Sequence, residues 1–83
     1  MYSILIIEDD VTFSFMLKTW LGKKGFEVDT ATSVSDARRR LEERKFDLVI
    51  SDLRLPDGDG IEFLKWLKET HATLPLIMMT SYA

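Results

Sequence analysis

Acidic and hydroxyl side chains stand where three short apolar runs of this sequence end. Glu8 and Asp9 follow the first run, Asp52 follows another, and Thr80 follows the last. A carboxylate is costly to bury unless it opens onto a site that uses it. Such apolar runs are typical of buried strands. If the strands that end at Glu8 and at Asp52, the first and third of the chain, are neighbours, the three carboxylates converge, and their like charges raise at least one pKa. A hard divalent cation such as Mg²⁺, which prefers oxygen ligands, resolves that conflict.

The chemistry that fits this arrangement is phosphoryl transfer. A bound cation polarises a phosphoryl group, and an aspartate beside it can form an acyl phosphate. We expect Asp52 to be that aspartate and the Thr80 hydroxyl to hydrogen-bond the phosphoryl oxygens. Taken singly, acids at strand ends often cap helices, as we expect for Asp10, and a strand-end threonine often bonds to the backbone. The joint pattern at three strand ends favours a shared site.

The elements that must position these residues alternate between strands and helices. Apolar or alternating runs predict strands, and apolar residues at helical spacing predict amphipathic helices. The predicted strands are residues 4–7, 26–31, 47–52 and 76–79, and the predicted helices are residues 11–24, 34–44 and 60–71. This alternation predicts an α/β fold with a doubly wound parallel sheet. In such a sheet the polar site lies beyond the carboxyl ends of the strands.

Local signals predict where the helices begin. The predicted caps are Asp10 or Thr12, then Ser33 paired with Asp36, then Asp59 paired with Glu62. We expect a loop over residues 53–60, because proline and glycines interrupt regular structure there. The arginine run at residues 38–40 is predicted to be a solvated face, with a partner-docking patch as the alternative.

Length and composition bound the class of protein. The 83 residues suffice for one small domain, with 46% apolar and 30% charged residues. The net charge of −3 argues against direct nucleic-acid binding. The absence of cysteine excludes disulfides and thiolate catalysis, and it fits a reducing compartment such as the cytoplasm. No run approaches the roughly 18 apolar residues of a membrane-spanning helix, so we expect no membrane contact.

The chain resembles the receiver domain of bacterial two-component response regulators. The segments that carry the resemblance are residues 4–10, 47–60 and 74–81. It implies a flavodoxin-like fold whose four strands lie in the order 2-1-3-4. It also implies that Asp52 is the phosphoacceptor, that Asp9 is a direct Mg²⁺ ligand, and that Glu8 acts partly through water.

The same resemblance assigns further roles. The main-chain carbonyl of Arg54 resembles the third protein ligand of Mg²⁺, beside the carboxylates, and Thr80 resembles the switch hydroxyl. Pro56 and Gly60 resemble the residues that shape the loop after the phosphoacceptor. The implied function is a signalling module that a partner histidine kinase phosphorylates and that regulates an output domain or partner. It is not an enzyme, apart from Mg²⁺-dependent autophosphorylation from small donors.

The chain departs from the family after its fourth strand. The family continues with a fourth helix, a fifth strand bearing a lysine, and a fifth helix, so the resemblance implies that residues 1–83 are a truncated receiver domain with an incomplete switch. An open apolar strand edge and a bare helix face would follow. We expect a two-fold homodimer to cover them. Its contacts would be Leu76, Ile77, Met78 and Met79 of the fourth strand, with Phe13 and Trp20 of the first helix.

Other functions are open to this pattern. One is an assembly-only receiver fragment that dimerises without phosphotransfer, which a tight dimer lacking Mg²⁺ binding would favour. An aspartyl-phosphate phosphatase would need an acid two residues after the nucleophile, where Arg54 stands. A nucleotide-binding domain would need a glycine-rich turn after the first strand, where Glu8 and Asp9 stand. His71 is predicted to be an exposed residue at a helix end.

Overall fold

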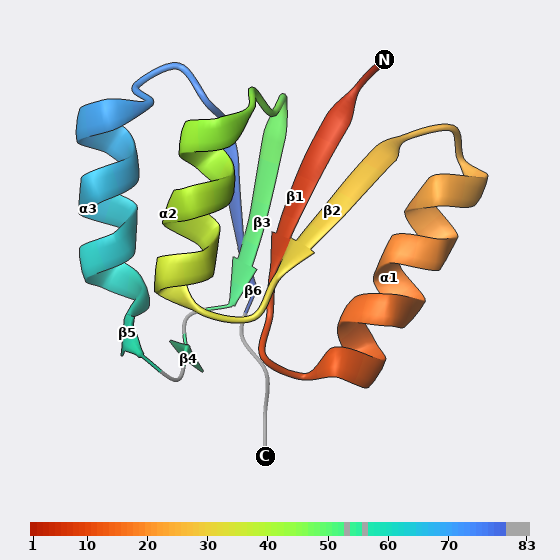
Figure 1. The fold of residues 1–83 in the computed structure, drawn as a ribbon, viewed down its shortest axis with the longest axis horizontal. Helices are drawn as coiled ribbons and strands as arrows, with labels where there is room; N and C mark the ends of the chain where they lie inside the picture. The colour runs from red at the N-terminus through yellow and green to blue at the C-terminus, as the bar shows by residue number, and fades with distance from the viewer. Residues whose placement is uncertain (53, 56, 80–83) are drawn as a thin grey trace.

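The computed structural model is an α/β sandwich, in which helices cover both faces of a sheet (Figure 1). It describes residues 1–52, 54–55 and 57–79. The elements, in chain order, are β1 (Ser3–Ile7), α1 (Val11–Lys23), β2 (Glu27–Ala31), α2 (Val34–Glu43), β3 (Leu48–Asp52), β4 (Arg54–Leu55), β5 (Gly58–Asp59), α3 (Gly60–Thr70) and β6 (Leu76–Met79).

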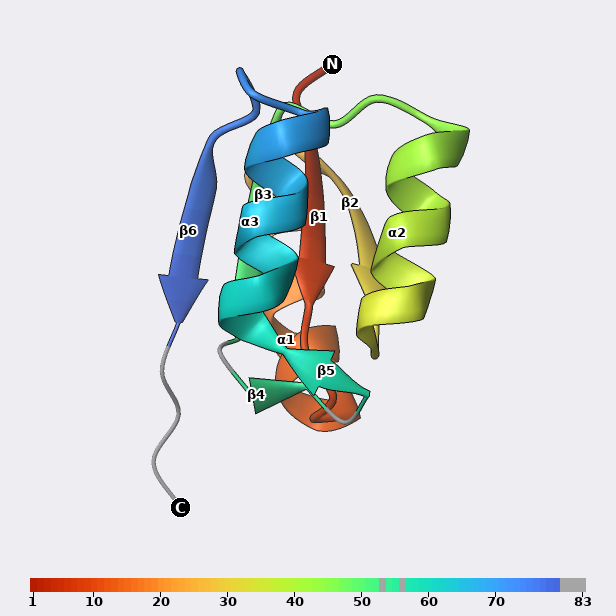
Figure 2. The same cartoon turned by 90° about the vertical axis from the view of Figure 1, so that its left-hand side faces the viewer.

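The main sheet has four parallel strands in the order β2-β1-β3-β6, as predicted. Helices α2 and α3 lie on one face of the sheet and α1 lies on the other (Figures 1 and 2). Strand β1 is buried along its whole length because it lies between β2 and β3 and has helices on both faces. Within the described part of the chain, no helix combines the length and hydropathy needed to cross a bilayer.

Two apolar clusters lie on the two faces of the sheet. The larger one lies under α2 and α3 and consists of Leu5, Ile7, Ala31, Ala37, Leu41, Phe46, Val49, Phe63 and Leu67. The smaller one lies under α1 and consists of Ile4, Ile6 and Leu21. Because strand side chains alternate between faces, β1 contributes to both clusters. The apolar core therefore lies on both faces of β1, the strand that Glu8 and Asp9 follow.

The apolar residues of α1 are only partly covered, as we expected of this helix. Ser14 and Leu21 are the buried residues of this helix, whereas Phe13, Met16 and Trp20 are 42%, 62% and 57% exposed. The helix lies beside β2 at one side of the sheet, so only one side of it is covered (Figure 1). The apolar surface that we expected to be bare on this helix is therefore present.

The predicted loop over residues 53–60 contains a small hairpin instead. Arg54 pairs with Asp59, and Leu55 pairs with Gly58, in antiparallel register. The same turn-forming composition that interrupts longer structure also permits a tight antiparallel hairpin, which is why the pattern alone did not reveal it. The hairpin β4–β5 joins the end of β3 directly to the start of α3.

The predicted caps have mixed outcomes. Asp10 caps α1, since its Oδ1 accepts a hydrogen bond from the backbone nitrogen of Phe13 at 3.1 Å. Ser33 caps α2 by accepting one from the backbone nitrogen of Asp36 at 3.1 Å. The carboxylate of Asp36 binds arginines of its own helix. The predicted cap at Asp59 lies outside the side chains that the structure describes.

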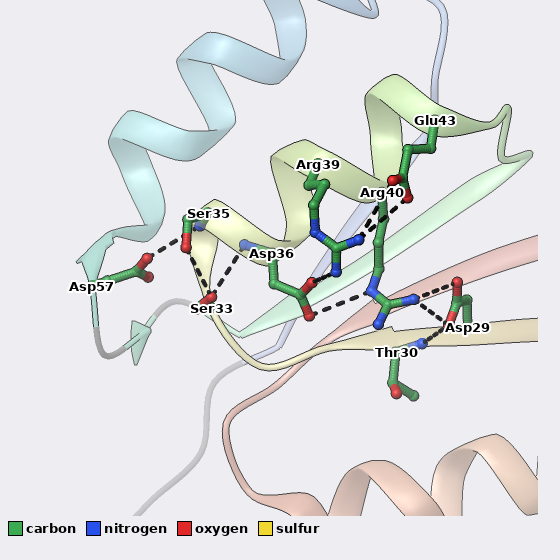
Figure 3. A network of polar contacts seen from close by, with 9 residues as sticks. All are labelled: Asp29, Thr30, Ser33, Ser35, Asp36, Arg39, Arg40, Glu43 and Asp57. Carbon is green, nitrogen blue, oxygen red and sulfur yellow. Dashed lines mark hydrogen bonds and ion pairs between the residues drawn. The ribbon is translucent and has the colours of Figure 1, made fainter.

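The arginine run on α2 is more than a solvated face. Arg40 is half-buried and joins α2 to the sheet, because its Nη1 donates to both carboxylate oxygens of Asp29 on β2, at 2.9 and 2.8 Å (Figure 3). Its Nε donates to Asp36 at 3.3 Å. Partial burial raises the pKa of Asp36, but hydrogen bonds from Arg39 and Arg40 outweigh that effect and the net shift is downward.

We expect Arg40→Leu to lower the free energy of unfolding by about 1–2 kcal/mol, between the values for exposed ion pairs and for charged hydrogen bonds. Urea denaturation measures this difference. Arg39→Ala is the matched control on the same helix, because Arg39 is exposed and its ion pairs are local. Equal losses for the two variants would contradict a bridging role for Arg40.

Candidate metal centre

Three carboxylates converge at the carboxyl end of the sheet. Strands β1 and β3 are parallel neighbours in which Ile7 lies opposite Ser51, so the residues that follow them reach the same edge. Glu8, Asp9 and Asp52 each offer a carboxylate oxygen there, and these oxygens lie within 4.8 Å of one another. The predicted convergence of these acids is confirmed.

The three acids differ in their exposure to solvent. Glu8 is 4% exposed and Asp52 is 2% exposed, whereas Asp9 is exposed. Two hydrogen bonds hold Glu8, one through its backbone and one through its side chain. Its own nitrogen donates to the carbonyl of Ala31 at 2.9 Å, and its Oε2 accepts from the backbone nitrogen of Asp10 at 3.1 Å. The site therefore consists of two buried acids, Glu8 and Asp52, and one exposed acid, Asp9.

Burial raises the pKa of Glu8 from 4.5 to about 7. The hydrogen bond from the backbone of Asp10 opposes this shift, while contact with Asp9 and the charge of Asp52 add to it. The predicted rise of at least one pKa is thus correct in direction. Its largest cause is desolvation of the buried Glu8, and the hydrogen bond with Asp9 raises the pKa more than the charge of Asp52 or that of Asp9 does.

The donor set fits a hard divalent cation. All three groups offer oxygen, and Mg²⁺ prefers oxygen ligands and retains part of its water shell. Ligand oxygens about 2.1 Å from Mg²⁺ lie up to about 4.2 Å apart. The observed limit of 4.8 Å therefore requires only a small inward movement of the side chains. Binding would also remove the electrostatic conflict among the three acids.

The structure describes only some of the remaining predicted site residues. Arg54 begins β4, two residues after Asp52 in the sequence. Gly60 is buried and begins α3. Thr80 and Pro56 lie outside the described residues. Met79, which precedes Thr80, lies opposite Asp52 in the register of β6.

Sequence reasoning missed two polar features outside the acidic cluster. The carboxylate of Asp57, at the turn of the β4–β5 hairpin, accepts hydrogen bonds from the backbone nitrogens of Val34 and Ser35, at 2.7 and 3.1 Å. The sequence marks Asp57 only as a turn residue, and no local signal indicates a helix that begins 23 residues earlier. On α1, Ser14 is buried, and its hydroxyl has no hydrogen-bond partner among the described residues.

The comparisons with known proteins agree with this geometry. The response regulator receiver domain family matches residues 4–83. Response regulator protein PilR of Pseudomonas aeruginosa is 33% identical over 94% of this chain, which spans 18% of that protein. The non-phosphorylated HemR receiver domain of Leptospira biflexa is 34% identical, with a TM-score of 0.92 over all of this chain and 67% of its own.

A second solved relative was determined as a complex with ligands. TrrA of Thermotoga maritima, solved in complex with Mg²⁺–BeF, is 29% identical with a TM-score of 0.92, over all of this chain and 72% of its own. The family match covers nearly the whole sequence, and the fold and the acidic cluster agree with it. The chain therefore belongs to the response regulator receiver domain family.

Proposed function

We propose that Asp52 of this receiver domain accepts a phosphoryl group from a phosphohistidine of a partner histidine kinase. The observation that carries the proposal is the convergence of Glu8, Asp9 and Asp52 within 4.8 Å. The solved complex of TrrA with Mg²⁺–BeF supports a metal and a phosphoryl-like group at such a site in this family. In this chain, Glu8, Asp9, Asp52 and the main-chain carbonyl of Arg54 would hold Mg²⁺.

The three acids are suited to different roles. Glu8 is buried and its carboxylate accepts a hydrogen bond from the backbone nitrogen of Asp10, which suits a fixed metal ligand. Asp9 is exposed, which suits a group that meets the hydrated cation first. Asp52 is the last residue of β3 and is held by a central strand of the sheet. Its place at the end of a central strand suits a group that must be held in position for attack on an incoming group.

In the proposed reaction, a carboxylate oxygen of Asp52 attacks phosphorus and the bond from phosphorus to the histidine nitrogen breaks. The electron pair of that bond returns to the imidazole, which takes up a proton on leaving, and an acyl phosphate forms on Asp52. When bound, Mg²⁺ supplies neutralisation of the phosphoryl oxygens. We propose that the hydroxyl of Thr80, which follows the register partner of Asp52, bonds to those oxygens as the switch contact.

The biological role that follows is a phosphorylation signal passed to an output domain or partner. The receiver would act beside its kinase in the cytoplasm, as a phosphoacceptor and not as an enzyme with a substrate of its own. Pro56 and Gly60 would shape the connection from Asp52 to α3, through which a change at Asp52 could reach a neighbouring surface.

Intact mass measurement after incubation with acetyl phosphate and Mg²⁺ tests this proposal. We expect the mass increase of one phosphoryl group, and we expect chelation of Mg²⁺ to abolish it. Asp52→Asn removes the acceptor, while Asp47→Asn is the matched control because Asp47 precedes the opposite end of the same strand. An adduct that persists in Asp52→Asn would refute the assignment.

The exposed apolar surface supports a second candidate function, a receiver that assembles into a homodimer without phosphotransfer. Phe13 and Trp20 on α1 are 42% and 57% exposed, and Ile77 on β6 is 51% exposed. β6 is an edge strand of the described sheet, and none of its residues, Leu76, Ile77, Met78 and Met79, is charged. Pairing through β6 and α1 would bury these side chains.

Analytical ultracentrifugation over a range of concentrations tests the dimer. We expect self-association that Ile77→Lys weakens, because a charge on the apolar edge would have to be desolvated in the interface. Lys65→Ala, a change on α3, is the control. A monomer at every concentration would exclude assembly through these residues. If Ile77→Lys does not change the affinity of the dimer, the β6 edge is excluded as the dimer interface.

A further inference from the structure

The turn of the β4–β5 hairpin is anchored on another helix. Both carboxylate oxygens of Asp57 are used: Oδ1 accepts from the nitrogen of Val34 at 2.7 Å, and Oδ2 accepts from the nitrogen of Ser35 at 3.1 Å. These are the first two residues of α2 (Figure 3 shows Asp57 beside Ser35). We call this pair of hydrogen bonds the Asp57 clasp.

The clasp provides hydrogen-bond acceptors for backbone amides at the start of α2. The first amides of a helix have no partner within the helix, and a negative charge is favourable at that end. The two backbone hydrogen bonds lower the pKa of Asp57, so its carboxylate remains charged at neutral pH. Because two bonds from two residues are made at once, the clasp sets the orientation of the hairpin turn as well as its position.

The other end of the same hairpin follows Asp52 of the candidate metal centre closely in sequence. Arg54 starts the hairpin directly after Asp52 and Leu53, and it pairs with Asp59 across the two short strands. The hairpin is therefore fixed at three points: at β3 through Asp52, at α3 through Gly60, and at α2 through the clasp. The two paired positions of this short hairpin link its turn to the main chain of Arg54.

We propose that Asp57 is a positioning residue, whose clasp on α2 holds the β4–β5 hairpin so that the Arg54 carbonyl stays aligned with the carboxylates for Mg²⁺. This inference rests on the proposed function, and it adds α2 as a part of the molecule that responds to the site. Coupling between two sites is reciprocal, so a cation that gains from the clasp must also strengthen it. The start of α2 then reports whether the metal centre is occupied.

The same helix supplies a matched control. Ser33 caps α2 locally, through its bond from the nitrogen of Asp36 at 3.1 Å, and this contact does not involve the hairpin. Removing either cap weakens the start of α2 by a similar amount. A change in metal affinity that follows Asp57 alone therefore separates positioning of the hairpin from general loss of helix stability.

The experiment combines calorimetric titration of Mg²⁺ with amide hydrogen exchange on the full chain, for wild type, Asp57→Ala, Asp57→Asn and Ser33→Ala. We expect Asp57→Ala to weaken Mg²⁺ binding about tenfold, the lower end of the range for partners of metal ligands, and Ser33→Ala to leave it unchanged. Added Mg²⁺ should slow exchange at Val34 and Ser35 in wild type and Ser33→Ala, but not in Asp57→Ala. Asp57→Asn, which keeps one acceptor oxygen, should be intermediate and stands in if the alanine variant fails to fold.

Two results would overturn the inference alone: equal Mg²⁺ affinity in the Asp57 variants and Ser33→Ala, or exchange at Val34 and Ser35 that Mg²⁺ does not change in wild type. If wild type binds no Mg²⁺ at all, the proposed function fails and the positioning role fails with it. The wild-type titration therefore distinguishes the two failures.

Discussion

Asp9→Ala lowers the affinity for Mg²⁺ by at least about 100-fold, beyond the usual effect of losing a partner of a metal ligand. The same change leaves the metal-free protein folded and, above the pKa of Glu8, slightly more stable, because it removes one of three carboxylates whose oxygens lie within 4.8 Å of one another. Calorimetric titration measures the affinity, and urea denaturation without Mg²⁺ measures the stability. Opposite signs for the two effects are expected of a metal site and not of a structural ion pair.

Asp10→Asn is the control for Asp9→Ala. It removes a charge from the same loop but keeps the cap of α1, since asparagine caps helices about as well as aspartate. We expect its Mg²⁺ affinity to stay close to that of wild type. Wild-type affinity in Asp9→Ala, or an equal loss in both variants, would contradict direct ligation by Asp9.

The stability of the metal-free protein should fall as the pH rises through neutrality. The pKa of Glu8 is raised from 4.5 to about 7, so the folded state binds more protons than the unfolded state between these values. The contribution of Glu8 to stability is therefore complete below 4.5 and is lost as the pH rises through about 7. At 1.36 kcal/mol per pKa unit, the loss has an upper limit of about 3 kcal/mol.

Glu8→Gln separates this effect from other titrations. Glutamine has a similar shape and no charge, so the variant should be more stable than wild type above neutral pH when Mg²⁺ is chelated. Saturating Mg²⁺ should reverse the order, because only glutamate supplies a charged ligand. Urea denaturation at several pH values, with and without Mg²⁺, measures both. Wild-type stability that rises across neutrality without metal would contradict the enclosed, protonated Glu8.

Two other acids titrate in the opposite sense and in a different range. The pKa values of Asp36 and Asp57 are both below 3.8, so their stabilising contacts are present above that value and are lost as the pH falls through their folded pKa. The change of stability at acidic pH therefore depends on the contacts of α2 and the Asp57 clasp. The change of stability near neutral pH depends on Glu8.

The core of the site was predictable because short-range signals determine it. Continuous apolar runs indicate central strands, alternation with helices makes the strands parallel, and acids placed after the runs must then meet at one edge. This reasoning reached the parallel sheet and, on the condition that the first and third strands are neighbours, the meeting of Glu8, Asp9 and Asp52, while the strand order itself was implied by the resemblance to receiver domains. It also reached a raised pKa among the three acids, though not that Glu8 is the acid concerned or that burial is the main cause, because the degree of burial depends on the folded surroundings.

What the sequence did not reveal depends on contacts between distant segments. Periodicity shows that α1 has apolar residues, but the extent of the sheet beside it decides that Ser14 is covered and Trp20 is not. Likewise, Arg40 reaches Asp29 and Asp57 reaches Val34 across long stretches of chain. Charged and turn-forming residues have the same local appearance whether they bridge two elements or face water.

The most direct test of the central claim is to locate the phosphoryl group chemically. After incubation with acetyl phosphate and Mg²⁺, borohydride reduces an aspartyl phosphate to homoserine, which marks the acceptor for peptide sequencing by mass spectrometry. The account predicts homoserine at position 52 and at no other aspartate of the chain. Homoserine at Asp9 or elsewhere, or its complete absence when Mg²⁺ is bound, would contradict the assignment of Asp52 as the phosphoacceptor.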